Sequence, residues 1–256
     1  MAYNIVCHGN SITEGTGAET TYPTQLDTLL GGAHVVYNEG TGGITTPALV
    51  DNFASEVQAH YAEGEDNIVV FWESSNFFSI GYAVETEKAN LLEYSELCIA
   101  NGWRLIICNV IQRGIVNALS SLEEWRPKVA ELNEWLSYNW HSFAHAYCNF
   151  HDLNSAFSTP FEGNGDATYF VDQAHLTTVG YGLIAAEVQA AISRINTSYE
   201  VVAPSGATKL IADYRLANGK TATIYDNNGQ ALSYVLSEGT PAITTNPTSM
   251  AAYVSS

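Results

Sequence analysis

The most evident deficit of this 256-residue chain is positive charge. Nine Lys and Arg residues stand against 27 Asp and Glu residues, which gives a formal net charge of −18, and only 14% of the sequence is charged. A surface of this kind repels phosphate backbones and anionic lipids, so nucleic-acid binding and membrane-surface binding are not expected. Neutral substrates, such as a sugar ester, remain possible.

The chain also lacks long apolar runs, although 46% of it is hydrophobic. No run approaches about 18 apolar residues, so we expect no membrane insertion. The length suits one main domain with a small addition. The first predicted strand begins at Tyr3, which leaves no room for a signal peptide before it. Secretion, association with a virion and a cytoplasmic location all stay open.

Paired cysteines are missing as well. Four cysteines are present, none in a CxxC pair, and Cys7, Cys108 and Cys148 lie inside apolar, strand-like runs. We therefore predict that these residues and Cys98 are buried free thiols rather than disulfides or metal ligands.

What the chain does have is a regular alternation of apolar runs and helical patterns up to about residue 195. The predicted strands are 3–9, 34–40, 67–74, 104–111 and 145–153, and the predicted helices are 21–30, 46–61, 85–102, 120–140 and 177–195. Alternation of this kind is typical of βαβ crossovers, and nearly continuous apolar strands indicate a parallel sheet covered on both faces. The predicted fold class is α/β, with three layers (α/β/α, flavodoxin-like) and a five-stranded parallel sheet. In the helix at 46–61, four-residue steps place Leu49, Phe53, Val57 and Tyr61 on one face.

The pattern changes after residue 197. Short alternating runs, TATIYD and LSYVLS, are punctuated by Asn218-Gly219 and by Asn227-Asn228-Gly229, which are hairpin signals. We therefore divide the chain into a main domain at 1–197 and a small β-rich extension at 198–256.

A serine follows the first predicted strand directly, in HGNSITEG at residues 8–15. Either this is an ordinary βα loop, or Ser11 is a nucleophile at the carboxyl edge of the sheet, where sites of parallel sheets form. A nucleophilic serine needs a base that a third group orients. Of seven histidines, His175 has the suitable neighbour, because Asp172 precedes it by three residues in DQAH. The alternative is that Asp172 only caps the following helix.

Acyl transfer also needs hydrogen-bond donors for the oxyanion, and two further segments offer them. The glycine-rich turn NEGTGG at 38–43 follows the second strand, and Asn76 follows the third. Each alone is better explained as a tight turn or a strand-end asparagine. Together with Ser11 and His175 they lie on one rim of one sheet, which favours a common site.

These four segments resemble the conserved blocks of the SGNH hydrolase superfamily, the GDSL-type esterases, lipases and carbohydrate deacetylases. GNSITEG (9–15) resembles the first block, NEGTGGITT (38–46) the second, SSNFF (74–78) the third and DQAHLTTVGY (172–181) the last. The similarity runs from about residue 4 to 195, and its first and last blocks are the specific ones. It departs from the family pattern at three positions: Asn10 and Phe77 replace Asp, and Ser74 replaces Gly.

The resemblance implies a two-step acyl transfer without metal or cofactor. Ser11 would be the nucleophile, His175 the base and Asp172 its partner. The backbone of Ser11 and Gly43 and the side chain of Asn76 would form the oxyanion hole.

Substrate specificity is expected from loops on the same rim. The candidate substrate-binding residues are Trp72, Glu73, Phe77 and Gln112, with Arg113 and the segment 157–170 nearby. Aromatic residues among small polar ones could stack on a sugar or line an acyl pocket, or simply pack the loops. The composition favours removal of acetyl or another short acyl group from a saccharide, in the manner of phage tail-associated polysaccharide deacetylases.

Three other interpretations compete with this one. The chain could be an esterase of lipids or small esters, or a non-catalytic carbohydrate-binding or virion module that kept the fold. A flavodoxin-like nucleotide binder is disfavoured because GNSITEG has neither a Walker lysine nor GxGxxG spacing.

Overall fold

The structure is a computed structural model that describes residues 2–32, 34–114, 119–150 and 166–196, together with three short strands further on. Four parts of the sequence prediction lie outside the described residues: residues 157–165 of the segment 157–170, the last residues of the strand 145–153, and the turns Asn218-Gly219 and Asn227–Gly229. Among the described residues, no helix combines the length and the hydrophobicity needed to cross a bilayer.

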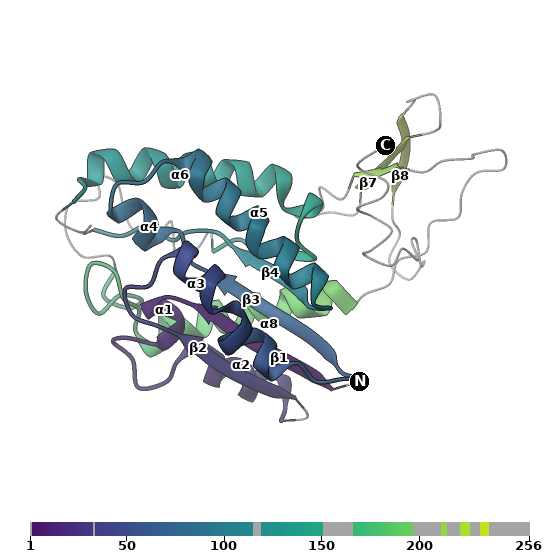
Figure 1. Cartoon of the computed structure of the whole chain (residues 1–256), viewed down its shortest axis with the longest axis horizontal. Coiled ribbons are helices and arrows are strands. Elements are labelled where there is room, and N and C mark those ends of the chain that lie inside the picture. The colour runs from purple at the N-terminus through teal and green to yellow at the C-terminus, as the bar shows by residue number, and fades with distance from the viewer. Residues whose placement is uncertain are drawn as a thin grey trace.

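A five-stranded parallel sheet forms the middle layer, in the order β2-β1-β3-β4-β5 (Figure 1). Its strands are β1 (Tyr3–Gly9), β2 (Val35–Gly40), β3 (Asp66–Trp72), β4 (Arg104–Cys108) and β5 (Ala146–Cys148). The predicted α/β class and strand number are therefore confirmed. Because β1 pairs with both β2 and β3, the residues that follow it emerge at the carboxyl edge of the sheet between the ends of these two strands.

Helices cover both faces of this sheet. The major helices are α2 (Tyr22–Leu30), α3 (Thr46–Asn52), α5 (Val84–Ala100), α6 (Leu122–Asn139) and α8 (Thr178–Asn196). Two one-turn helices, α1 (Ser11–Glu14) and α4 (Ser75–Ser79), follow β1 and β3, and sequence reasoning missed them because one turn is too short to show a periodic pattern.

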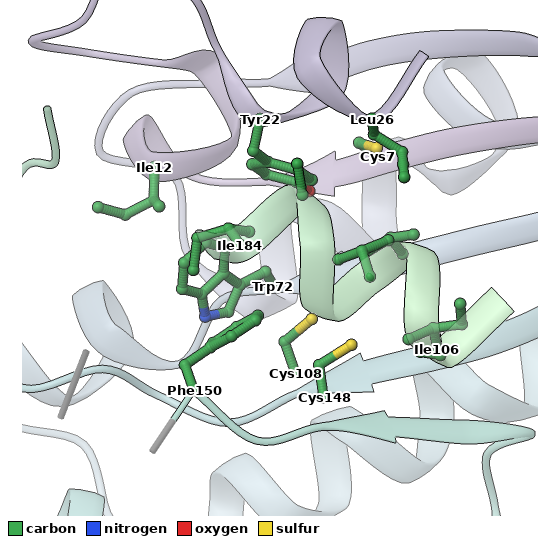
Figure 2. Packing of buried hydrophobic residues seen from close by; sticks show 14 of the residues in the cluster. Cys7, Ile12, Tyr22, Leu26, Trp72, Ile106, Cys108, Cys148, Phe150 and Ile184 are labelled. Atoms are coloured by element: carbon green, nitrogen blue, oxygen red, sulfur yellow. The ribbon is translucent and has the colours of Figure 1, made fainter. Parts of the chain in front are cut away.

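The core divides into two clusters, one on each side of the sheet. Along β1, Ile5 and Cys7 belong to the cluster under α2 and α8, whereas Val6 belongs to the cluster under α3, α5 and α6. Figure 2 shows the first cluster, where Tyr22 of α2 and Ile184 of α8 pack over Trp72. Successive strand residues point to opposite faces, so burial of both faces accounts for the unbroken apolar strands. All four cysteines are free and buried in this core.

The helix predicted at 46–61 differs from the observed segment. After α3 the chain continues as a π-helical turn at Phe53–Val57 and a 3₁₀ turn at Gln58–His60. Leu49, Phe53 and Val57 are all buried, but Tyr61 is 41% exposed and does not share their face. The prediction for Tyr61 was wrong because the four-residue step holds only in a regular α-helix, which ends before this residue.

β4 is three residues shorter than the predicted strand 104–111. It ends at Cys108, and after Asn109 the backbone leaves the ladder, because the backbone N–H of Val110 donates to the side chain of Asn133. Beyond residue 210, strands β6 (Ile211–Asp213), β7 (Thr221–Tyr225) and β8 (Ala231–Val235) form an antiparallel sheet in which β7 pairs with both neighbours. β7 and β8 coincide with the alternating runs TATIYD and LSYVLS, whereas β6 was not predicted.

Candidate active site

Ser11 is the first residue of α1, just beyond the end of β1. Asn10 caps this helix, because its side-chain oxygen accepts a hydrogen bond from the backbone N–H of Ile12 at 2.9 Å. Gly9 allows the close approach of the neighbouring strand, since a Cβ at this position would lie 2.5 Å from the carbonyl oxygen of Trp72. Ser11 therefore stands on a short, capped turn at the sheet's edge.

Asp172 and His175 occupy a tight loop just before α8. A bridge between Phe170 and Leu176 closes the loop, and the backbone N–H of Val171 donates to the carbonyl oxygen of His175 at 3.0 Å. One carboxylate oxygen of Asp172 accepts from the backbone N–H groups of Ala174 and His175, both at 2.7 Å. The other carboxylate oxygen lies 2.8 Å from His175 Nδ1.

This arrangement argues against Asp172 as a mere helix cap. At the start of α8 it is Thr177 whose side chain accepts from the backbone N–H of Gly180, at 3.1 Å. Partial burial alone would raise the pKa of Asp172, but the hydrogen bonds from the side chain and backbone of His175 and from Ala174 lower it below its usual range. The carboxylate is therefore kept ionised beside the imidazole.

The fold brings the loop to the serine. His175 Nε2 lies 3.0 Å from Ser11 Oγ, although the two residues are 164 positions apart in the sequence. Tyr181 of α8 donates to the carbonyl oxygen of Thr16 at 3.0 Å, and Gly17 packs against the loop so closely that a Cβ there would lie 2.5 Å from Val171. With the proton on Nδ1 toward Asp172, Nε2 is free to accept the proton of Ser11.

The two predicted oxyanion residues lie next to each other. Gly43 has a φ of 76°, which favours glycine, in the turn between β2 and α3. The side-chain amide of Asn76, in α4, donates one hydrogen to the carbonyl oxygen of Ile44 at 3.0 Å, so the adjacent turn holds this amide. Its NH₂ group carries a second hydrogen for another acceptor.

Ser11, Gly43, Asn76 and His175 line one pocket of about 360 Å³. Its apolar wall consists of Ile12, Trp72, Val110 and Ile111. Sequence reasoning named Trp72 but missed the other three. The predicted strand 104–111 includes Val110 and Ile111, but β4 ends at Cys108 and both residues lie in the loop after it. Loops that follow parallel strands form sites, and this rule is the signal that could have found them.

Three predicted substrate-binding residues do not line this pocket. Glu73 is 2% exposed and Phe77 is 1% exposed, and both face the interior. Gln112 is half-buried between two lining residues, Ile111 and Arg113, without lining the pocket itself. Glu73 follows Trp72 directly, and successive side chains of an extended chain point to opposite sides, so Trp72 lines the pocket and Glu73 does not. Within the described ranges, no three His, Cys, Asp or Glu side chains gather in a way that could hold a metal ion.

No family model and no curated protein matches this sequence, but solved structures do match its fold. A member of the lipolytic G-D-S-L family from Veillonella parvula is 20% identical with a TM-score of 0.60, over 75% of this chain and 100% of that one. A GDSL-like lipase from Bacteroides thetaiotaomicron is 19% identical with a TM-score of 0.58, over 74% and 87%. A carbohydrate acetylesterase family member from Sinorhizobium meliloti is 16% identical with a TM-score of 0.53, over 76% and 99%.

The chain has the SGNH hydrolase fold. Its departures from the family pattern can now be placed within that fold. Ser74, where the resemblance expects Gly, adopts a φ of 95°, a left-handed conformation that is uncommon for a residue with a side chain. Phe77, where the resemblance expects Asp, stacks on Tyr82 with ring centroids 4.5 Å apart. Asn10 keeps the turn by capping α1.

Proposed function

We propose that this protein is a serine esterase that hydrolyses carboxylic esters through an acyl-enzyme. The observation that carries the proposal is the chain of contacts from Asp172 through His175 to Ser11, with distances of 2.8 Å and 3.0 Å, opening onto a pocket. A serine becomes a nucleophile when a base accepts its proton and a third group orients that base. Ser11, His175 and Asp172 would supply these three parts.

In the first step, Ser11 Oγ bonds to the ester carbonyl carbon and its proton passes to His175 Nε2. The negative charge on the carbonyl oxygen is held by the backbone N–H groups of Ser11 and Gly43 and by the side-chain amide of Asn76. Collapse of this intermediate breaks the bond to the alcohol, which leaves with the proton from His175. Water then attacks the acyl-enzyme in the same way, and the acid and free Ser11 are regenerated.

We further propose that the substrate is a saccharide carrying acetyl or another short acyl group. The pocket, at about 360 Å³, is near the lower end of the usual range for ligand pockets, which favours a small acyl group. The net charge of −18 disfavours anionic lipids and phosphorylated substrates. The name of the structure from Sinorhizobium meliloti, a carbohydrate acetylesterase family member, agrees with this choice.

A serine-directed fluorophosphonate probe tests the hydrolase proposal. We expect the folded protein to be labelled and Ser11→Ala to remain unlabelled, because the probe reacts only with an activated serine. Ser75→Ala is the matched control, since Ser75 lines the same pocket without a place in the proposed catalytic chain. Absence of labelling in the folded protein, or labelling that survives Ser11→Ala, would leave the fold as a non-catalytic module.

The acyl preference is tested by comparing acetate release from acetylated polysaccharides with the hydrolysis of p-nitrophenyl esters of increasing chain length. We expect kcat/KM to be highest for acetyl esters and to fall as the chain lengthens, because the pocket is small. A kcat/KM that rises with chain length would instead favour a lipid esterase.

A further inference from the structure

Glu73 lies directly after β3 and points away from the pocket, yet it contacts both loops that carry the proposed chemistry. One of its carboxylate oxygens accepts a hydrogen bond from the side-chain amide of Asn10 at 2.5 Å. The other accepts from the backbone N–H groups of Asn76 and Phe77, each at 3.0 Å. Asn10 caps the helix that begins with Ser11. One side chain thus joins the nucleophile turn to the oxyanion turn.

The chain bends sharply to make these contacts. Ser74, between Glu73 and α4, has a φ of 95°, and it is the one described residue other than glycine with a positive φ. This left-handed residue turns the backbone so that the first N–H groups of α4 point back at the Glu73 carboxylate. Strained backbone of this kind persists only where the surroundings over-determine it.

The side chain of Asn76 is held from another direction. Arg113 donates to the Asn76 side-chain oxygen at 3.4 Å and to the carbonyl oxygen of Ser75 at 3.2 Å, while its guanidinium lies 5.1 Å from the centre of the Trp125 ring. The guanidinium can only donate, so it fixes the oxygen of the amide on its own side. The NH₂ group is then directed toward Ile44 and the pocket.

Glu73 is fully buried, and its charged neighbours come from two elements. Burial raises the pKa of its carboxyl to about 8, and the charge of Glu87 on α5 acts in the same direction. The hydrogen bonds from Asn10 and Phe77, and the positive charge of Arg113 beyond β4, act against this rise. All three hydrogen-bond partners are N–H donors, so a protonated carboxyl would turn one O–H toward a donor and lose a contact.

We propose that Glu73 is a positioning residue, which fixes Ser11 and Asn76 relative to each other by binding Asn10 and the backbone of Asn76 with one carboxylate. The proposal rests on the proposed function, because it assigns Glu73 a part in the same acyl transfer. A displacement of about 1 Å in a reacting group can cost about 10² in rate, so such a tether acts on kcat more than on KM.

The central test exchanges the amide of position 10 and the carboxylate of position 73. In Glu73→Gln, the side-chain oxygen still accepts from Asn76 and Phe77, but its NH₂ group faces the NH₂ group of Asn10. We expect kcat to fall about 10- to 100-fold with little change in KM. In Asn10→Asp/Glu73→Gln, the glutamine donates to the new aspartate, and we expect kcat to return to within about threefold of the parent protein.

A second variant tests the same proposal if Glu73→Gln does not fold. Asn10→Ser retains a good helix cap but cannot reach Glu73 with an amide. We expect it to stay folded by circular dichroism and to lose about tenfold in kcat. Glu56→Gln is the control, because Glu56 is another carboxylate that accepts from a side-chain amide, that of Asn52, and contacts a ring nitrogen of His8, but it does not line the pocket. We expect it to leave kcat unchanged.

The pH profile separates positioning from plain stabilisation. Because the pKa of Glu73 is raised in the folded protein, ionisation of this group weakens folding as pH rises from about 4.5 to about 8. Positioning needs the ionised form of Glu73. We therefore expect kcat to rise as the pH approaches about 8, in the upper part of the pH range over which stability falls. In Glu73→Gln the contribution of this carboxyl to both dependences should be absent.

The outcomes are distinguishable. If the parent protein neither reacts with the fluorophosphonate probe nor hydrolyses esters, the proposed function fails. If it is active and folded Glu73→Gln keeps the parental kcat, or if folded Asn10→Ser does so, the positioning proposal is overturned. It is also overturned if the folded double variant fails to recover, or if Glu56→Gln loses as much kcat as Glu73→Gln.

Discussion

Replacing His175 with alanine is expected to lower kcat by about 10⁶ while the protein stays folded. In this variant Ser11 keeps its place on α1 but loses the acceptor of its proton, which lies 3.0 Å away in the parent protein. Removing a nucleophile or a base from a serine hydrolase costs about 10⁶ in kcat, because each is useless without the other. The measurement is the initial rate of acetate release under saturating substrate.

The same reasoning predicts that the losses do not add. Ser11→Ala/His175→Ala should be no slower than either single variant, within about threefold, because the two side chains act as one unit. A double variant slower by the product of the two losses would show that they act separately.

His60→Ala is the matched control for this experiment. His60 is also a histidine hydrogen-bonded to a carboxylate, Glu39, at 2.7 Å, and its side chain is 24% exposed, as is that of His175. It does not line the pocket, so we expect the parental rate. A comparable loss in His60→Ala would assign the effect of His175→Ala to stability.

Replacing Asn76 with alanine is expected to lower kcat by about 10²–10³ with a smaller change in KM. An oxyanion donor is worth more to the transition state than to the ground state, because charge on the carbonyl oxygen develops only during reaction. The side chain of Asn76 is well placed for this task, because the carbonyl oxygen of Ile44 and the guanidinium of Arg113 fix its orientation at the pocket wall. Rate measurements at saturating and at low substrate separate kcat from KM.

Asn139→Ala provides the comparison for lost packing and lost hydrogen bonding. Its side-chain amide also donates to a backbone carbonyl oxygen, that of Trp135, at 2.8 Å, but it lies in α6 away from the pocket. We expect the parental kcat there. A near-parental rate in Asn76→Ala would remove this residue from the oxyanion hole, and the backbone N–H groups of Ser11 and Gly43 would remain as donors.

The departure at Asn10 has a counterpart elsewhere in the chain. Where the resemblance expects a carboxylate beside the nucleophile, this chain has an amide, and a carboxylate stands at Glu73 within hydrogen-bond distance of it. The sequence predicted Glu73 in the substrate pocket because it lies at the end of a predicted strand, at the edge of the sheet where sites form. The structure turns it inward, because side chains alternate in direction and Trp72 takes the pocket side.

Local features were the ones that the sequence predicted well. The five strands followed from apolar runs that are buried on both faces. The start of α2 followed from Pro23 and the end of α5 from Gly102, because the backbone preferences of these residues act locally. The contact between Asp172 and His175 was also predictable, because three residues on a turn bring the carboxylate to the ring nitrogen. The shift of Tyr61 to the surface was not, because a π-helical turn depends on packing rather than on periodicity.

By itself, then, the sequence determined a parallel α/β sheet, a serine after its first strand, and an Asp–His pair before its last helix. These features depend on hydrophobic pattern and on residues a few positions apart. Only the tertiary structure decided that Ser11 and His175 meet across 164 positions, that Val110 and Ile111 wall the pocket, and that Glu73 joins two loops from beneath. Such contacts depend on how strands lie beside each other and on which way each side chain turns, and no local pattern encodes either.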